Sequence, residues 1–175
     1  MTEKINCPYC GIIGTLDERR CLSCGAPFSI PTGPEEEDSL GQNLVDQIRD
    51  ACTAYEEIES CHIKETIPER KLENAKAAFE IAEEDDVILV YDGTVFGNNK
   101  LGFAICKSGI YWKNDWTTPT KRTYLDWNEY KERNIKKKKK DFHISLGQGD
   151  KIAIVDEEDI NDLSDLLKDI QDLFW

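Results

Sequence analysis

Apolar and polar positions alternate most clearly in the middle of the chain, between Leu101 and Lys113. Two β-prone runs meet there across a turn signal, Lys107-Ser108-Gly109. The alternation predicts a β-hairpin in which the odd-numbered residues Leu101 to Ile105 point to one side and the even-numbered residues Gly102 to Cys106 to the other. We expect Gly109 to adopt the positive φ angle that closes a three-residue loop. An isolated hairpin is only marginally stable in water, so further strands must flank it.

Extended segments precede and follow this hairpin. The run Val87 to Tyr91 is continuously apolar, which is typical of a strand buried on both faces. A turn signal from Gly147 to Asp150 separates the last two segments. The pattern predicts about seven strands, near residues 87–92, 101–106, 110–114, 121–126, 133–138, 141–146 and 151–155.

Helical periodicity marks two segments in front of the strands. Ser39-x-x-Gln42 fits a capping box, and apolar residues then recur at helical spacing to about Ser60. Thr66-x-x-Glu69 fits a second capping box, which is followed by an apolar stripe of Leu72, Ala75, Phe79 and Ala82. We expect both helices to pack on each other and on the sheet. An alternative use of the 39–60 helix is the seam of a homodimer, and the sequence does not decide between the two.

A last amphipathic segment ends the chain. Asp156 fits its N-cap, and the acids Glu157 to Asp159 suit the positive end of the helix dipole. Its apolar face consists of Ile160, Leu163, Leu167, Ile170 and Phe174. Seven antiparallel strands followed by one such helix predict an α+β fold.

The N-terminal segment carries two Cys-x-x-Cys pairs, Cys7 with Cys10 and Cys21 with Cys24, each followed by glycine. Two residues between thiolates let one tight turn place both sulfurs on a metal ion, and four thiolates complete a closed tetrahedral site. The spacing predicts a zinc ribbon over residues 1–30 with one structural Zn²⁺. The alternative, a redox Cys-x-x-Cys motif, would require one pair inside a β-α-β unit. The remaining cysteines are expected to be small buried residues: Cys52, Cys61 and Cys106.

The domain organisation follows from these patterns. Residues 31–38 are rich in proline, glycine and acids, which is typical of an acidic linker. We therefore expect a zinc ribbon at 1–30, the linker at 31–38, two amphipathic helices within 39–84, and the β domain with its C-terminal helix at 85–175.

Charge is distributed very unevenly along the chain. The formal net charge of −13 arises from a neutral segment at residues 1–30, −12 at 31–86, +6 at 87–155 and −7 at 156–175. A preference of the whole molecule for nucleic acid or anionic membranes is therefore disfavoured. The central segment alone can present a basic face.

The candidate binding residues lie in that basic segment. Lys136, Lys137, Lys138, Lys139 and Lys140 are consecutive, and Lys121 and Arg122 lie on an expected strand that can join the same face. One interpretation is a solvated edge strand, because lysines discourage aggregation between sheet edges. The alternative is a site for a polyanion, either anionic lipid or nucleic acid. Four aromatic residues would assist a nucleic-acid site but are expected in the core: Tyr111, Trp112, Trp116 and Trp127.

Residues 86–173 resemble a pleckstrin-homology (PH) fold in their order of strands and final helix. The resemblance implies that the strands form an antiparallel β barrel followed by the C-terminal helix. The run Gly102 to Trp112, followed by Tyr124-Leu-Asp-Trp127, is also similar to the bacterial PH-like domains. Cys106 stands where the hairpin motif of that family has threonine. The whole arrangement resembles bacterial cytosolic proteins that join a zinc ribbon to a C-terminal PH-like domain. The resemblance implies a binding or scaffolding module without catalytic residues.

Motifs that would indicate an enzyme are weak. Asp92-Gly93-Thr94 after an apolar strand invites comparison with haloacid-dehalogenase phosphatases, but Val90 occupies the position of the nucleophile. His62 and His143 have no serine or cysteine motif beside them. Catalysis by residues that meet only in the folded chain is the third alternative for function.

These observations favour a non-enzymatic zinc-binding interaction or scaffold module with a protein partner, and a polyanion-binding protein is the second alternative. No apolar run approaches the roughly 20 residues of a membrane span. The first residues, Met-Thr-Glu-Lys-Ile-Asn, lack the apolar core of a signal peptide, so we expect a cytoplasmic protein.

Overall fold

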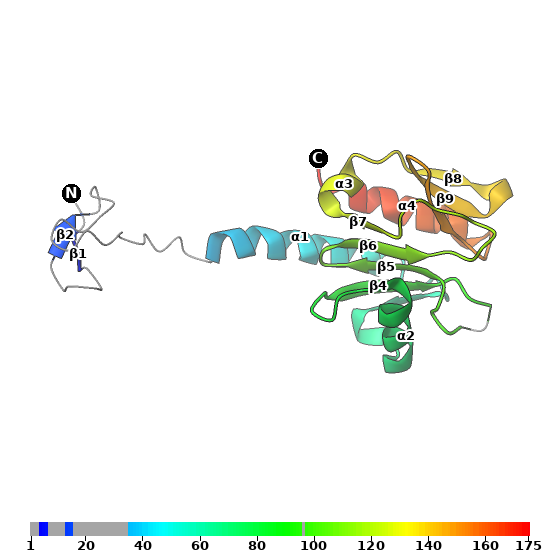
Figure 1. Ribbon diagram of the computed structural model, residues 1–175, viewed down its shortest axis with the longest axis horizontal. Helices are drawn as coiled ribbons and strands as arrows, with labels where there is room; N and C mark the ends of the chain where they lie inside the picture. Colours follow the sequence, from blue (N-terminus) through cyan, green and yellow to red (C-terminus); the bar gives the residue numbers. More distant parts are fainter. Residues whose placement is uncertain (1–3, 7–12, 16–34, 96) are drawn as a thin grey trace. The chain divides into compact units, whose positions relative to one another are not determined.

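The computed structural model describes residues 4–6, 13–15, 35–95 and 97–175, and it describes side chains from residue 41 onward (Figure 1). The chain divides into two compact units, Met1–Leu40 and Gly41–Trp175. In the first unit, β1 (Lys4–Asn6) and β2 (Ile13–Thr15) form an antiparallel pair. The helix α1 (Glu35–Thr53) crosses the boundary in sequence.

The second unit contains an antiparallel sheet of five strands in the order β3-β4-β5-β6-β7. The sheet is a meander, because each strand pairs with its neighbour in sequence. The strands are β3 (Cys61–Ile63), β4 (Val87–Asp92), β5 (Gly102–Cys106), β6 (Gly109–Lys113) and β7 (Tyr124–Asp126).

A second antiparallel sheet has three strands in the order β10-β9-β8. These are β8 (Lys136–Lys138), β9 (His143–Gly147) and β10 (Asp150–Ala153). All seven predicted strands are therefore present. They form two separate sheets in the described part of the chain, however, and the edge strand β3 was not predicted from the sequence.

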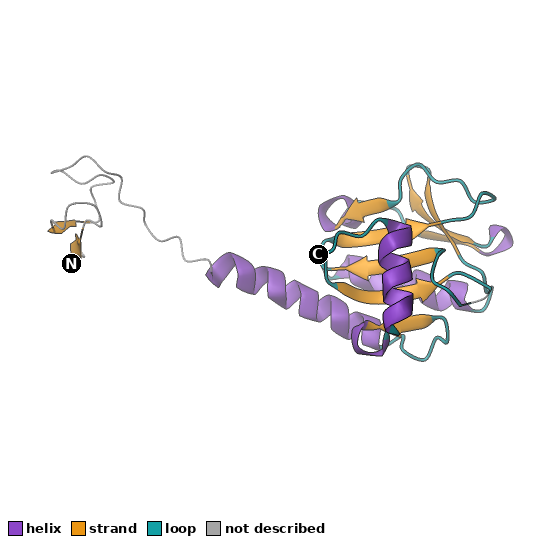
Figure 2. Ribbon diagram, turned by 60° about the horizontal axis from the view of Figure 1, so that its bottom comes forward, coloured by secondary structure: helices purple, strands orange, loops and turns teal. Residues whose placement is uncertain are grey.

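The five-stranded sheet separates two hydrophobic clusters. Phe103 and Ile105 of β5 contribute to the larger cluster, and Ala104 and Cys106 of the same strand contribute to the smaller one. The predicted division of the hairpin between two faces is thus confirmed. Figure 2 shows α2 (Glu69–Phe79) crossing the face of the sheet that carries the smaller cluster.

The larger cluster lies between the two sheets and the remaining helices. α1 contributes Val45, Ile48 and Cys52 to it, so the two N-terminal helices pack into different clusters rather than on each other. The final helix, α4 (Asp159–Asp172), buries the predicted stripe from Ile160 to Ile170 in the same cluster. The apolar face of α1 from Val45 to Cys52, which we considered as a homodimer seam, is therefore buried against other parts of the same chain.

The helix boundaries differ from the predicted ones. α1 begins at Glu35 rather than Ser39, takes up the acidic end of the predicted linker, and ends at Thr53 rather than near Ser60. Thr66 does not cap α2. Its hydroxyl instead accepts from Ile63 N at 3.1 Å and donates to Ile63 O at 2.9 Å, because the chain forms a 3₁₀ turn (Lys64–Thr66) before Pro68 starts the helix.

The C-terminal helix also begins later than predicted. Asp156 accepts from Glu158 N at 2.9 Å in the preceding turn, and α4 starts at Asp159. Between β7 and β8 a short helix, α3 (Trp127–Lys131), occupies residues for which no element was predicted. Asp126 caps this helix by accepting from Glu129 N at 2.9 Å.

Gly109 is needed for a different reason from the predicted one. It is absent from the residues with positive φ, and the hairpin loop consists of Lys107 and Ser108 alone. A Cβ atom on Gly109 would collide with Leu125 O and lie 2.9 Å from Asp126 Cα on the neighbouring strand β7. Glycine is therefore required by the close approach of two backbones.

Candidate interaction surface

The register of the three-stranded sheet gathers lysines that are distant in sequence. Lys136 of β8 pairs with Ser145 of β9, which in turn pairs with Lys151 of β10. Two residues further along β8, Lys138 pairs with His143. Paired residues share a face, and the intervening positions Ile144 and Ile152 are buried in the core. The opposite, outward face therefore carries Lys136, Lys138 and Lys151, and we call these three residues the basic face.

Lys121 lies next to the same sheet. Its Cε atom would be 2.8 Å from a Cβ placed on Gly149, which belongs to the turn between β9 and β10. The structure thus brings Lys121 to the β9–β10 end of the sheet, although fourteen residues lie between it and Lys136 in sequence. Lys139 and Lys140 continue from β8 into a 3₁₀ turn and are exposed.

None of these lysines forms an ion pair with a described residue. The ion pairs among residues 41–95 and 97–175 involve other bases, and none joins a carboxylate to Lys121, Lys136–Lys140 or Lys151 within 4.0 Å. Lys137 instead donates to the amide oxygen of Asn161 in α4 at 3.0 Å. The acidic C-terminal segment therefore places no described carboxylate in direct contact with these lysines.

The two edges of this sheet differ in how their backbone groups are satisfied. Side chains cover the outer edge of β10. Asn114 donates to Lys151 O and accepts from Ala153 N, both at 2.8 Å, and Thr120 accepts from Lys151 N at 3.3 Å. β8 pairs with β9 on one side only, and no described residue bonds to the backbone of its other edge. That open edge carries the first three lysines of the run, Lys136–Lys138.

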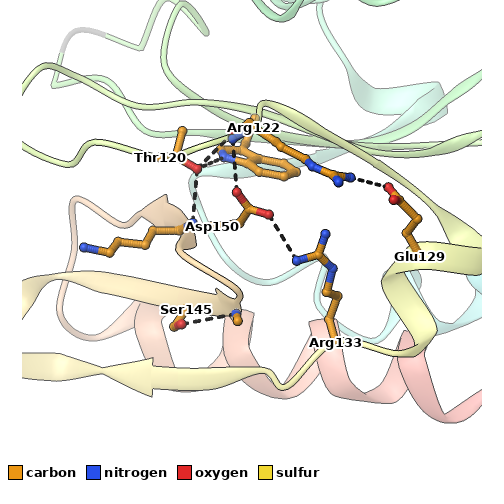
Figure 3. Close-up of polar contacts among 9 residues, drawn as sticks. Thr120, Arg122, Glu129, Arg133, Ser145 and Asp150 are labelled. Atoms are coloured by element: carbon orange, nitrogen blue, oxygen red, sulfur yellow. Dashed lines mark hydrogen bonds and ion pairs between the residues drawn. The ribbon is translucent and has the colours of Figure 1, made fainter.

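Arg122, the other predicted binding residue, is turned away from the sheet. Its guanidinium donates to Glu129 of α3 at 2.6 Å, and this hydrogen bond raises the pKa of the guanidinium (Figure 3). Its backbone N–H donates to the Asp150 carboxylate at 3.0 Å. Arg122 therefore holds the segment that carries Lys121 in place, and its own charge is engaged within the chain.

A buried ion pair anchors this region, and sequence reasoning missed it. The Arg133 guanidinium lies 3.2 Å from the Asp150 carboxylate, with both side chains almost fully buried (Figure 3). Gln171 of α4 donates to the nearby carbonyl oxygens of Tyr130, Lys131 and Arg133 at 2.7 to 3.1 Å. These polar contacts join three parts of the chain: the start of β10, the segment that follows α3, and the helix α4. No local pattern marks them, because their members are widely separated in sequence.

The aromatic residues considered for base stacking are mostly in the core, as expected. Trp112 and Trp127 are buried, and Tyr111 is half-buried. Trp116 is the exception, because 92% of its surface is exposed in the loop after β6. Among the described residues, no row of exposed aromatic rings lies on the basic face, although such a row would be typical of single-stranded nucleic-acid sites.

The predicted zinc ligands Cys7, Cys10, Cys21 and Cys24 lie outside the described residues. Among the described residues, no group of His, Cys, Asp and Glu side chains is suited to hold a metal ion. The other three cysteines are free and buried, as predicted. Burial raises the pKa of the Cys52 thiol to about 12, so this thiol is neutral and unreactive at physiological pH.

Asp92 forms a second polar cluster at the end of β4. Its Oδ1 atom accepts from Thr94 N at 3.1 Å, Thr94 Oγ1 at 2.5 Å and Asn99 N at 3.1 Å. Its Oδ2 atom receives no directed hydrogen bond but lies 3.2 Å from the Lys71 ammonium. That ammonium donates to His62 Nε2 at 2.8 Å. The cluster fastens the loop between β4 and β5 and ties it to α2.

Comparisons of the chain with family models, curated proteins and solved structures return no match. Within the described residues, no helix combines the length and the apolar character needed to cross a bilayer.

Proposed function

We propose that this chain is a non-enzymatic interaction module that contacts a protein partner through the basic face and the adjoining β8 edge. The observation that carries this proposal is a set of seven lysines, Lys121, Lys136–Lys140 and Lys151, without a carboxylate partner among the described residues. The chain as a whole has an excess of acids, with a net charge of −13. Lysines left unpaired in such a chain are available to a ligand with negative charge.

The same charge distribution favours a compact partner over an extended polyanion. α4 and the preceding turn carry a net charge of −7 from residue 156 to residue 175, and Lys137 reaches Asn161 in this helix. A nucleic-acid duplex or a membrane surface is wide enough to meet both the lysines and these acids. A protein segment can contact the lysines alone. Binding of a polyanion, through anionic lipid or nucleic acid, is therefore the second candidate, and the lysine run is the observation that favours it.

We also propose a PH-like fold for the β domain. Its support is the order of elements: four meandering strands from β4 to β7, three from β8 to β10, and the helix α4. PH-like domains serve many proteins as scaffolds, so the resemblance is compatible with an interaction module but does not identify a ligand. For the N-terminal unit we propose one structural zinc ion on Cys7, Cys10, Cys21 and Cys24, which rests on their spacing.

The proposed function can be tested by site-specific photo-crosslinking in the native cell. A photoreactive amino acid replaces Lys138 on the basic face in one variant and Lys100, an exposed lysine in the β4–β5 loop, in the control. We expect a protease-sensitive, nuclease-resistant adduct at position 138 and none at position 100. In a cell lysate, high salt added before irradiation should reduce the amount of adduct at position 138, because exposed charge contacts are screened.

Two outcomes would contradict the proposal. Adducts at position 138 that consist only of nucleic acid or lipid would favour the second candidate. Equal adducts at positions 138 and 100, or none at either position, would mean that the basic face is not a contact surface.

A further inference from the structure

We infer that the contact segment of the partner is an acidic, extended stretch of polypeptide that adds to the open edge of β8 as a fourth strand of the three-stranded sheet. This inference rests on the proposed function, since it names the chemistry of the partner at the same surface. It is carried by two independent features of β8, its backbone and its charge.

The backbone of β8 is prepared for strand addition. Lys136–Lys138 are paired with β9 on one side, and no described residue bonds to the other side. An extended segment can therefore continue the ladder of N–H to C=O hydrogen bonds. At about 3.3 Å per residue, the three residues of β8 offer a contact roughly 10 Å long, which suits about three to five residues of a partner.

The charges of β8 select the composition of that segment. Lys136 and Lys138 project from the outward face of the sheet, whereas Lys137 projects toward Asn161 of α4. A strand paired with β8 places every second side chain beside Lys136 and Lys138. Acids at alternate positions of the partner would therefore pair with these two lysines, and a neutral side chain would lie between them, toward Lys137 and Asn161.

The same charges disfavour other occupants of the edge. A second copy of the chain that paired β8 with β8 would place lysines directly opposite lysines, which is destabilising. A polynucleotide would meet the lysines but has no peptide groups to continue the ladder. The inference thus separates into two measurable requirements, negative charge on the partner and a peptide backbone free to donate.

The inference can be tested by NMR titration of the full-length, zinc-containing protein labelled with ¹⁵N. The probe is a seven-residue peptide in which glutamate alternates with threonine. We expect the amide signals of Lys136–Lys138 and of the paired residues in β9 to shift, with a dissociation constant no weaker than about 1 mM. The backbone control is the same peptide with alternate amides N-methylated, and we expect it to bind about tenfold more weakly because ladder hydrogen bonds are lost.

Two protein variants test whether binding depends on the lysines of β8 or only on the total charge of the protein. Lys136→Gln with Lys138→Gln should weaken binding about fivefold or more, since two close charge contacts are removed. Lys100→Gln with Lys107→Gln removes two exposed lysines elsewhere and should leave binding unchanged. All of these residues are exposed, so both variants should unfold at the same denaturant concentration as the parent.

Three results would overturn the inference: no shift at β8 with about 1 mM peptide, equal affinity for the N-methylated peptide, or equal binding by a thymidine heptanucleotide at the same amides. If any of these occurred while position 138 still crosslinked to protein, strand addition would be wrong and the proposed function would stand. If the protein adduct at position 138 were also absent, both the strand addition and the proposed function would be wrong.

Discussion

The Arg133 guanidinium lies 3.2 Å from the Asp150 carboxylate, and the two side chains are 3% and 2% exposed. Burial of such a pair requires that each charge keep its partner, because an isolated ion in the protein interior loses its hydration without compensation. Asp150 also accepts from the backbone N–H of Arg122. The carboxylate therefore connects the start of β10 to the segment before β7 and to the segment after α3. These connections position Lys121 and Lys151, the neighbours of Arg122 and Asp150 in sequence.

Replacement of Arg133 by Met should be strongly destabilising. The change leaves the Asp150 carboxylate buried with only the Arg122 N–H as a donor, and we expect the free energy of unfolding to fall by about 3 to 5 kcal/mol. Urea denaturation provides the measurement. The double variant Arg133→Met with Asp150→Asn should recover part of the loss, because the uncompensated charge is removed. A loss below about 1 kcal/mol in the single variant would show that water reaches the pair.

Replacement of Tyr130 by Phe tests a second connection between α3 and α4. The Tyr130 hydroxyl is fully buried and donates to Leu167 O at 2.5 Å. Its removal leaves a buried carbonyl without this donor, so we expect a loss of about 1 to 3 kcal/mol in urea denaturation. Tyr111→Phe is the matched control, because Tyr111 is only half-buried and its hydroxyl is 3.3 Å from Ser108 Oγ. Equal losses in the two variants would contradict the assigned role of the Tyr130 hydrogen bond.

Stability should decrease as the pH falls below about 6.5. Partial burial, and then the positive charge of Lys71, lower the pKa of His62 from its ordinary value of 6.5. Between the lowered pKa of the folded chain and 6.5, the unfolded chain binds more protons than the folded one. The free energy of unfolding is therefore highest above pH 6.5 and decreases as the pH falls from 6.5 through the pKa of His62 in the folded chain. Urea midpoints at about pH 7.5 and 5.5 measure the effect. His62→Gln should reduce the difference between the two midpoints, and an unchanged difference would exclude His62 as its source.

The protein should contain one zinc ion bound by the four cysteines in Cys-x-x-Cys pairs. Metal analysis of protein purified without chelator should give about one equivalent, because a segment as small as residues 1–30 buries too little apolar surface to fold without metal. Cys21→Ser with Cys24→Ser should lose the ion. Cys52→Ser is the control, since Cys52 lies in the core of the second unit, and should retain the ion. Zinc content that is unchanged by the double substitution would disprove this ligand set.

The strands and the final helix could be predicted because burial leaves a local period in the sequence. β5 contributes alternate residues to two clusters, and α4 buries the predicted stripe from Ile160 to Ile170. Helix boundaries were less predictable, because a capping pattern such as Thr66-x-x-Glu69 can be used by a neighbouring turn instead. β3 has only three residues, too few to show a period.

The sequence by itself determined the seven strands from β4 to β10, the three longer helices, the positions of the basic residues, and the cysteines with metal-ligand spacing, since each depends on neighbours a few positions apart. Only the tertiary structure decided the pairing of Lys136 with Ser145 and of Ser145 with Lys151, the burial of Arg133 against Asp150, and the engagement of Arg122 by Glu129. These contacts depend on sheet register and on the packing of distant segments. Their free energies come from burial and from hydrogen bonds that form only when the chain has folded, so no local pattern records them.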